Sequence, residues 1–192
     1  MLVLSTVARF ITLDSTVFSD FKKITRKDLL GLLFIVSLFS GLLVLFFSQQ
    51  YVSADTLGFD ITQFSLVISA SILLVVVPIF VLFVYVSSYV SSWLYYFVSR
   101  LFTKKGSRET LFVGLLLSSP VILVSILPGF IGTIGTVWMI VLTVFLVMHA
   151  LQLSLMQAIA TYIFTFIMMV ILLVIPLFLF FVLMSLSGAV WF

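Results

Sequence analysis

The residue best placed to do chemistry in this chain is His149, the only histidine among 192 residues. Gln152 follows one helical turn later, so a helix would bring the two polar side chains to one face. A histidine near a membrane can relay protons or bind a metal. No carboxylate or thiolate lies close by in the sequence, so His149 and Gln152 cannot complete a zinc site. We favour a polar helix end that is hydrogen-bonded to a neighbouring helix.

The acidic residues offer little more chemistry. Asp55 and Asp60 lie in a polar stretch between two apolar runs. We interpret them as solvated residues of a loop, which is simpler than a paired-carboxylate site. Glu109 follows Arg108 at an expected helix start, where a carboxylate meets the positive end of the helix dipole. The chain has no Walker loop, dinucleotide fingerprint, HExxH motif or Ser-His-acid set. We therefore predict a protein that is not an enzyme, with no catalytic, cofactor-binding or metal-binding residues.

The composition defines the class of protein. The chain is 64% hydrophobic and only 8% charged, whereas a soluble domain carries about 25% charged residues. The apolar runs are continuous and do not alternate with polar residues, which predicts helices and excludes the strands of a barrel. The fold class is therefore all-α, a polytopic transmembrane helix bundle. The absence of cysteine excludes disulfides, palmitoylation and thiolate metal sites.

The basic residues fall into two clusters. The first consists of Arg9, Lys22, Lys23, Arg26 and Lys27, and the second of Arg100, Lys104, Lys105 and Arg108. Basic loops remain in the cytoplasm, where anionic headgroups attract each such charge by about 1 kcal/mol. We predict an interaction surface on the cytoplasmic face made by both clusters except Arg9. No nucleic-acid partner is expected, because no soluble domain carries the charges.

Five apolar runs have the length of a membrane span, about 20 residues. They are residues 29–48, 64–99, 111–127, 133–152 and 158–186. The second run would be roughly 54 Å long as a helix, which is too long for one bilayer core of about 30 Å. We favour one over-long helix over two spans, because two spans would put the basic clusters on opposite faces.

Three of these runs contain an internal proline, and Pro78, Pro120 and Pro176 predict kinks or interruptions. Five spans would place the N-terminus in the cytoplasm and the C-terminus outside, in a multi-pass protein of the cell membrane.

Residues 1–28 precede the membrane domain of residues 29–192 and are too polar to span. Their apolar side chains recur at helical spacing in two groups, separated by Asp14 and Ser15, which are typical N-cap residues. This pattern predicts two short amphipathic helices at the membrane interface. The alternative is a partly ordered tail.

Several motifs resemble those of the Yip1-domain membrane proteins. They are the loop from Arg100 to Glu109, Ser119-Pro120, Trp138, His149 with Ala158 after it, and Phe21-Lys-Lys-Ile-Thr25. The resemblance implies five spans, a polar inner loop after the second span and a proline in the third. The chain lacks the long N-terminal region and the Gly-Tyr element of eukaryotic members. It is therefore similar to the prokaryotic branch, whose members resemble accessory or scaffolding proteins, in some cases beside ABC-type exporters.

Three functions remain open on the sequence. We favour a scaffold or accessory protein that acts through helix–helix contacts and a basic cytoplasmic face. Its partners would be anionic lipid headgroups and a membrane protein or a second copy of the chain, since small residues four apart, such as Ser37 and Gly41, let helices approach closely. The alternatives are a transporter or channel for a small solute, and a lipid-modifying enzyme that uses His149.

Overall fold

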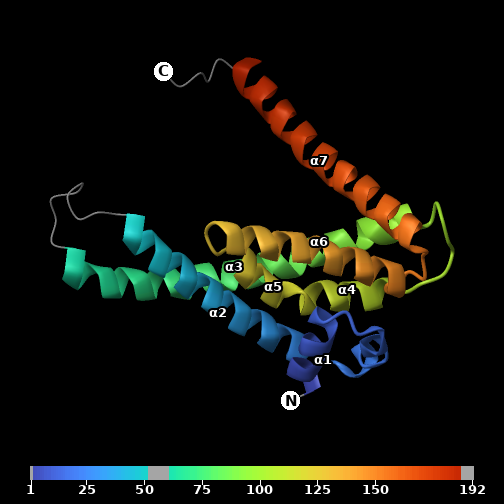
Figure 1. Ribbon diagram of the computed structural model, residues 1–192. Coiled ribbons are helices and arrows are strands. Elements are labelled where there is room, and N and C mark those ends of the chain that lie inside the picture. Colours follow the sequence, from blue (N-terminus) through green and yellow to red (C-terminus); the bar gives the residue numbers. More distant parts are fainter. Residues whose placement is uncertain (1, 52–60, 187–192) are drawn as a thin grey trace.

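The computed structural model describes residues 2–51 and 61–186, and its regular structure in these ranges is entirely helical (Figure 1). The elements are α1 (Leu2–Ile11), η1 (Ser15–Ser19), η2 (Phe21–Lys23), α2 (Arg26–Tyr51), α3 (Ile61–Ser99), α4 (Arg108–Leu117), α5 (Ser119–Ser125), α6 (Phe130–Ala150) and α7 (Leu155–Leu186). The predicted all-α class is confirmed. Asp55 and Asp60 lie outside the described residues.

The long helices have the length and composition of membrane spans. Within the described residues, four stretches qualify: Val77–Ser99, Arg108–Ser125, Phe130–Ala150 and Leu155–Leu183. α2 covers the first predicted run and is 26 residues long. The protein is therefore a multi-pass membrane protein.

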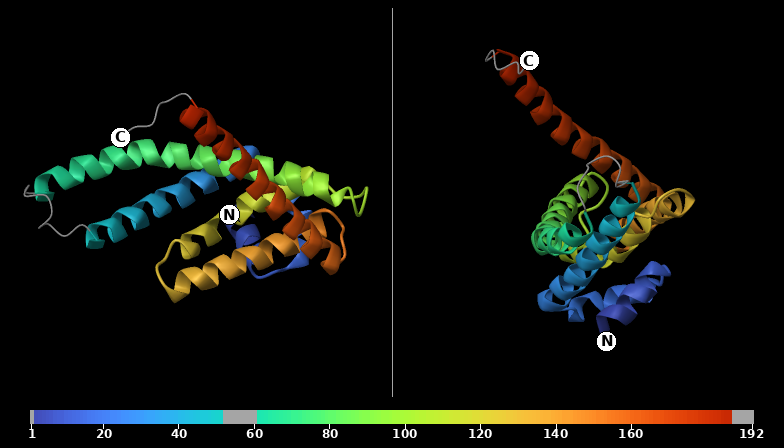
Figure 2. Two further views of the ribbon diagram at one scale, coloured as in Figure 1. Left: turned by 90° about the horizontal axis from the view of Figure 1, so that it is seen from above. Right: turned by 90° about the vertical axis from the view of Figure 1, so that its left-hand side faces the viewer.

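α3 is one continuous helix of 39 residues, so the longest apolar run does not fold as a pair of helices. Pro78 lies inside it, and α3 arches along its length (Figure 2), as expected where a proline removes a backbone donor. α2 runs from the end of the bundle that carries the first basic cluster to the opposite end, and α3 runs back towards the starting end. The loop after α3 therefore returns to the end of the bundle where α2 begins (Figure 1).

The third predicted run is interrupted near its proline, as expected. α4 and α5 meet at Ser118, and Pro120 occupies the first turn of α5. The Ser118 hydroxyl donates to the Leu115 carbonyl at 2.7 Å. α6 then begins at Phe130, earlier than the sequence indicated, because Gly129 with φ of +73° makes the turn.

The apolar surfaces of the helices face both protein and lipid. Leu33 of α2 is buried in the bundle, whereas Phe34 and Phe39 of the same helix are each 53% exposed. This two-sided hydrophobicity explains why the spans show no amphipathic pattern. Ser37 of α2 and Ser92 of α3 are buried, so at these positions the small residues serve packing within the bundle.

α7 differs between its two halves. Ala158, Thr161 and Thr165 in its first half are fully buried, and Tyr162 stacks on Tyr95 of α3. From residue 166 to 183 no residue is buried. Met169 still packs against the core, and beyond it the helix stands away from the other helices (Figures 1 and 2).

Residues 2–25 form a small helical unit, here called the N-terminal cap, on the basic end of the bundle. The predicted second helix takes the form of two short 3-10 helices, and Asp14 caps the first by accepting from the Thr16 N–H at 2.9 Å. Phe10 and Val17 are completely buried. The apolar face predicted for the bilayer interface thus packs on the protein itself, while Leu4 remains 67% exposed.

Candidate functional site

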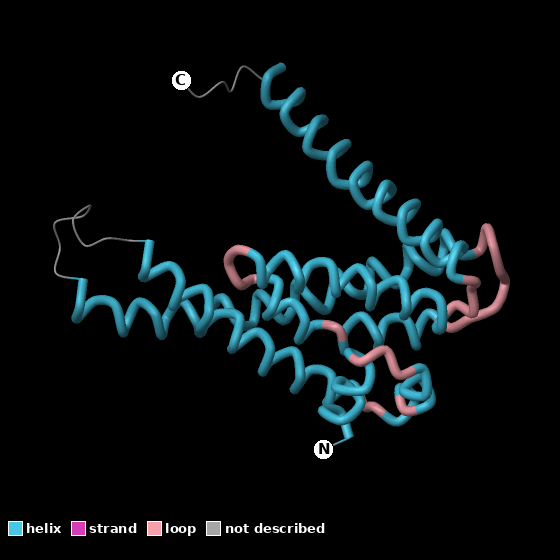
Figure 3. The backbone as a smooth tube through the Cα atoms, in the orientation of Figure 1, coloured by secondary structure: helices cyan, strands magenta, loops and turns pink. Residues whose placement is uncertain are grey.

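The loop between α3 and α4 is fixed to the turn between α6 and α7, which lies beside it (Figure 3). The Ser107 N–H donates to the Ala150 carbonyl at 2.9 Å. Gly106 has φ of +98°, and a Cβ there would lie 2.5 Å from the Leu151 Cα. A glycine is therefore needed for both the backbone conformation and the close approach. The contact sets where the second basic cluster sits.

Arg108 begins α4 and is held by aromatic rings of α3. Its guanidinium carbon lies 5.2 Å from the centre of the Tyr89 ring and 5.1 Å from that of Trp93. Such cation–π contacts contribute about 0.5–1 kcal/mol at exposed sites. Ser107 caps the same helix by accepting from the Thr110 N–H at 3.3 Å. These contacts position Arg108 without an ion pair to any carboxylate in the part of the chain that the structure describes.

The start of α2 is organised by a reciprocal cap. Thr25 donates from its backbone N–H and its hydroxyl to Asp28 at 3.1 and 2.7 Å, and the Asp28 N–H donates back to Thr25 at 3.3 Å. This is a capping box with aspartate as the acidic member. It fixes the direction in which the chain enters α2, with Lys22 just before the cap and Arg26 inside it.

The two basic clusters meet around one pocket of about 310 Å³. Its charged lining residues are Lys22 and Arg26 from the first cluster, Arg108 from the second, and Glu109. The remaining lining consists of Phe21, Ile24, Leu29, Tyr85, Tyr89, Phe112 and Val113, with Ser107 and Thr110. We call this site the basic pocket. The sequence predicted its three cations, but the aromatic and apolar wall carries no sequence signal of its own.

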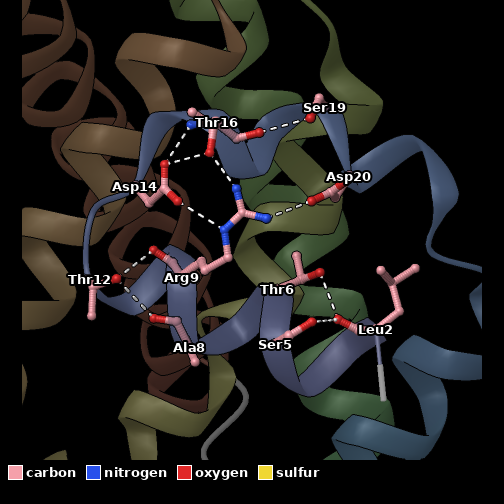
Figure 4. Close-up of polar contacts among 10 residues, drawn as sticks. All are labelled: Leu2, Ser5, Thr6, Ala8, Arg9, Thr12, Asp14, Thr16, Ser19 and Asp20. Carbon is pink, nitrogen blue, oxygen red and sulfur yellow. Dashed lines mark hydrogen bonds and ion pairs between the residues drawn. The ribbon is translucent and has the colours of Figure 1, made fainter.

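Two other basic residues of the first cluster, Arg9 and Lys23, form ion pairs inside the N-terminal cap, and Figure 4 shows those of Arg9. Arg9 pairs with Asp14 and Asp20, in each case at 2.9 Å, and also donates to the Thr16 hydroxyl. Lys23 pairs with Asp20 at 2.9 Å. All ion pairs formed between described residues belong to this network. The pocket cations Lys22, Arg26 and Arg108 are not in an ion pair with any described carboxylate.

The same network shifts the acid pKa values of the cap. Hydrogen bonds from the Thr16 hydroxyl and then from Arg9 lower the pKa of Asp14 to about 2, from an ordinary 3.8. The ammonium of Lys23, with a smaller effect from Arg9, lowers the pKa of Asp20. Both carboxylates therefore remain charged at every physiological pH.

The remaining predicted cations lie outside the pocket. Arg100 lies 4.2 Å above the Tyr96 ring and donates to the Lys104 carbonyl at 2.5 Å. Lys27, Lys104 and Lys105 are exposed. The predicted interaction surface thus divides into a pocket of three cations, one cation paired in the cap, and four on the surface.

His149 is packed between aromatic rings. Its ring stacks on Phe18 with centres 5.0 Å apart and planes 10° apart, and it lies 4.3 Å from the Phe145 ring. Its Nδ1 is 2.9 Å from the Phe145 carbonyl. The hydrogen-bond partner is thus on its own helix, where we expected a neighbouring one.

Gln152 does not join His149 in a polar site. It is exposed at the end of α6 with φ of +54°, and no hydrogen bond links the two side chains. Within residues 2–51 and 61–186, no three His, Cys, Asp or Glu side chains are grouped so that they could hold a metal ion.

Continuous apolar helices with a charged end define a multi-pass helical membrane protein. The Yip1 domain model matches residues 9–178. The match covers most of the chain, including every residue of the basic pocket, and the protein belongs to the Yip1 domain family. Neither the curated proteins nor the solved structures gave a match.

Proposed function

We propose that the protein is a non-enzymatic scaffold or accessory protein of the cell membrane, of the prokaryotic type. It acts through helix–helix contacts and a basic cytoplasmic end. We count five spans, with α2 as the first, because 26 residues extend about 39 Å. The N-terminus and both basic clusters then lie in the cytoplasm and the C-terminus outside.

The observation that carries this proposal is the meeting of two distant basic clusters at one end of the bundle. Lys22 and Arg26 come from one cluster and Arg108 from the other, and all three line one pocket. An anionic membrane surface attracts such a concentration of charge. A cytoplasmic partner with acidic residues would meet the exposed Lys104 and Lys105 of the same end.

α7 supports the second half of the proposal. Among the residues that the structure describes, nothing buries its apolar surface between residues 170 and 183. Phe178 and Phe181 are 65% and 68% exposed. A helix of a membrane partner, or α7 of a second copy, would pack on this surface through the dispersion contacts that drive helix association in lipid.

The surroundings of His149 favour a structural role over the lipid-modifying alternative. A catalytic histidine is expected to lie within hydrogen-bond reach of the reacting group or of a nucleophilic side chain. His149 has Phe18, Phe145 and a backbone carbonyl around it. We therefore propose that the protein has no enzymatic activity.

The experiment is mild cross-linking in native membranes, followed by purification of the full chain in a gentle detergent. We expect a discrete homo-oligomer or a co-purifying membrane protein. The double variant Phe178→Ala/Phe181→Ala should lose this oligomer or partner. The control Leu82→Ala/Phe83→Ala should keep it, since it changes equally exposed residues on α3. A monodisperse monomer without any partner would refute the proposal.

A further inference from the structure

We propose that the basic pocket binds the phosphate headgroup of one anionic phospholipid from the leaflet at that end of the bundle. The proposal rests on the proposed function in one respect, namely that this end faces an anionic membrane surface. It goes further by naming a single bound lipid and the residues that hold it.

The charge of the pocket suits a phosphate. Three cations line it against the single carboxylate of Glu109, and the three are not paired with described carboxylates. A guanidinium offers two parallel donors to phosphate oxygens. The rings of Tyr89 and Trp93 hold Arg108 in place, so little side-chain entropy is lost when it binds.

The wall of the pocket distinguishes a lipid from a free anion. Phe21 and Leu29 on one side are buried. On the other side Phe112 packs edge-on against Tyr85 and Tyr89, with ring centres 5.3 and 5.9 Å apart. A pocket with cations and an apolar aromatic wall matches a headgroup whose phosphate continues into the carbons of a glycerol backbone. A soluble phosphate has no apolar part to place against that wall.

The location of the pocket also favours a lipid as its ligand. It lies where α2 and α4 begin, beside Tyr85 and Tyr89, about three to four turns before α3 ends. We place this level where the spans meet the headgroup region. Aromatic residues such as Tyr89 and Trp93 are typical of this level. The volume of about 310 Å³ is at the small end of ligand pockets. It accommodates a headgroup while the acyl chains remain in the bilayer.

Native mass spectrometry of the full-length protein in detergent tests the inference, with titrations of phosphatidylglycerol, phosphatidylcholine and inorganic phosphate. We expect one phosphatidylglycerol per chain to bind in preference to phosphatidylcholine. The double variant Arg26→Gln/Arg108→Gln should weaken it about tenfold or more, since each hydrogen bond to a charged group is a substantial part of such affinity. Arg108→Lys should weaken the affinity for phosphatidylglycerol less, because lysine keeps the positive charge.

The matched control is Lys104→Gln/Lys105→Gln, which removes the same charge from the same end outside the pocket. Equal weakening in both double variants would mean diffuse attraction and would overturn the inference. Equal binding of phosphatidylcholine, or displacement of the lipid by millimolar inorganic phosphate, would overturn it too. If the double variant does not fold, Lys22→Gln at an exposed position gives the same comparison with Lys104→Gln. These readouts are independent of the cross-linking result, so either proposal can fail alone.

Discussion

At the scale of single residues, the basic side chains at this end differ by whether a carboxylate is within reach. Arg9 and Lys23 are paired with Asp14 and Asp20 and so hold the N-terminal cap together. Arg26 and Arg108 face the pocket instead. The sequence showed the positions of all these cations, but not this division, since it depends on which segments fold against one another.

Asp14 provides the first prediction. Its pKa is lowered to about 2 from 3.8, so its stabilising contribution is present above about pH 4 and is lost as the pH falls towards 2. The Asp14→Asn variant reports the pH dependence of pepsin itself in a brief digestion. Relative to that variant, wild-type protein should release peptides of the N-terminal cap much more slowly at about pH 4 but nearly as fast at about pH 2. The Asp14→Asn variant should be readily cleaved at both pH values. A ratio of wild-type to variant cleavage that is the same at both pH values would contradict the assigned network. Glu109→Gln, which changes a carboxylate outside the cap, is the control.

His149 provides the second prediction. Because its ring is packed between Phe18 and Phe145, His149→Phe should leave the thermal unfolding temperature in detergent nearly unchanged. His149→Ala should lower the free energy of unfolding by about 1–2 kcal/mol, through lost aromatic contacts. If His149 instead took part in chemistry, both His149→Phe and His149→Ala would be inactive in a functional assay, although His149→Phe remained as stable as the wild type.

At the scale of elements, the sequence predicted what depends on local chemistry. The continuous α3 followed from the placement of charges, and the break between α4 and α5 followed from Pro120. What the N-terminal cap packs against did not follow, because helical spacing shows that Phe10 belongs to an apolar face but not what covers that face. Phe10 and Val17 are buried against the protein, but their apolar side chains would also be removed from water if they entered the lipid. Likewise, no periodicity shows that Tyr85 and Tyr89 of α3 line a pocket with Lys22.

The contact between the α3–α4 loop and the end of α6 provides the third prediction. Gly106→Ala should destabilise the protein by about 2–4 kcal/mol. An alanine is strained at the positive φ of this position, and its Cβ would also clash with the Leu151 backbone. Gly31→Ala is the matched control, since a Cβ there meets nothing within 4 Å. That change should stabilise α2 by about 0.5–1 kcal/mol. Thermal unfolding in detergent measures both, and equal effects would show that the loop is not held as described.

At the scale of the whole molecule, the Yip1-domain chain combines a compact, charged end with a long helix whose second half is exposed and apolar. The basic end joins the N-terminal cap, the start of α2 and the α3–α4 loop, while the second half of α7 is left for lipid or a partner helix. This division of surfaces suits a protein that holds other membrane components in place. It depends on α3 crossing the membrane once, so that the two basic clusters share a compartment.

Cysteine accessibility tests that claim most directly, and the absence of native cysteine makes single substitutions specific. Lys27→Cys and Lys105→Cys lie in the two basic clusters, and Phe130→Cys lies at the far end of the bundle, at the first residue of α6. In sealed cells, a membrane-impermeant thiol reagent should label Phe130→Cys but neither of the other two, which should react only after permeabilisation. Labelling of positions 27 and 105 from opposite sides would contradict the architecture proposed for this protein.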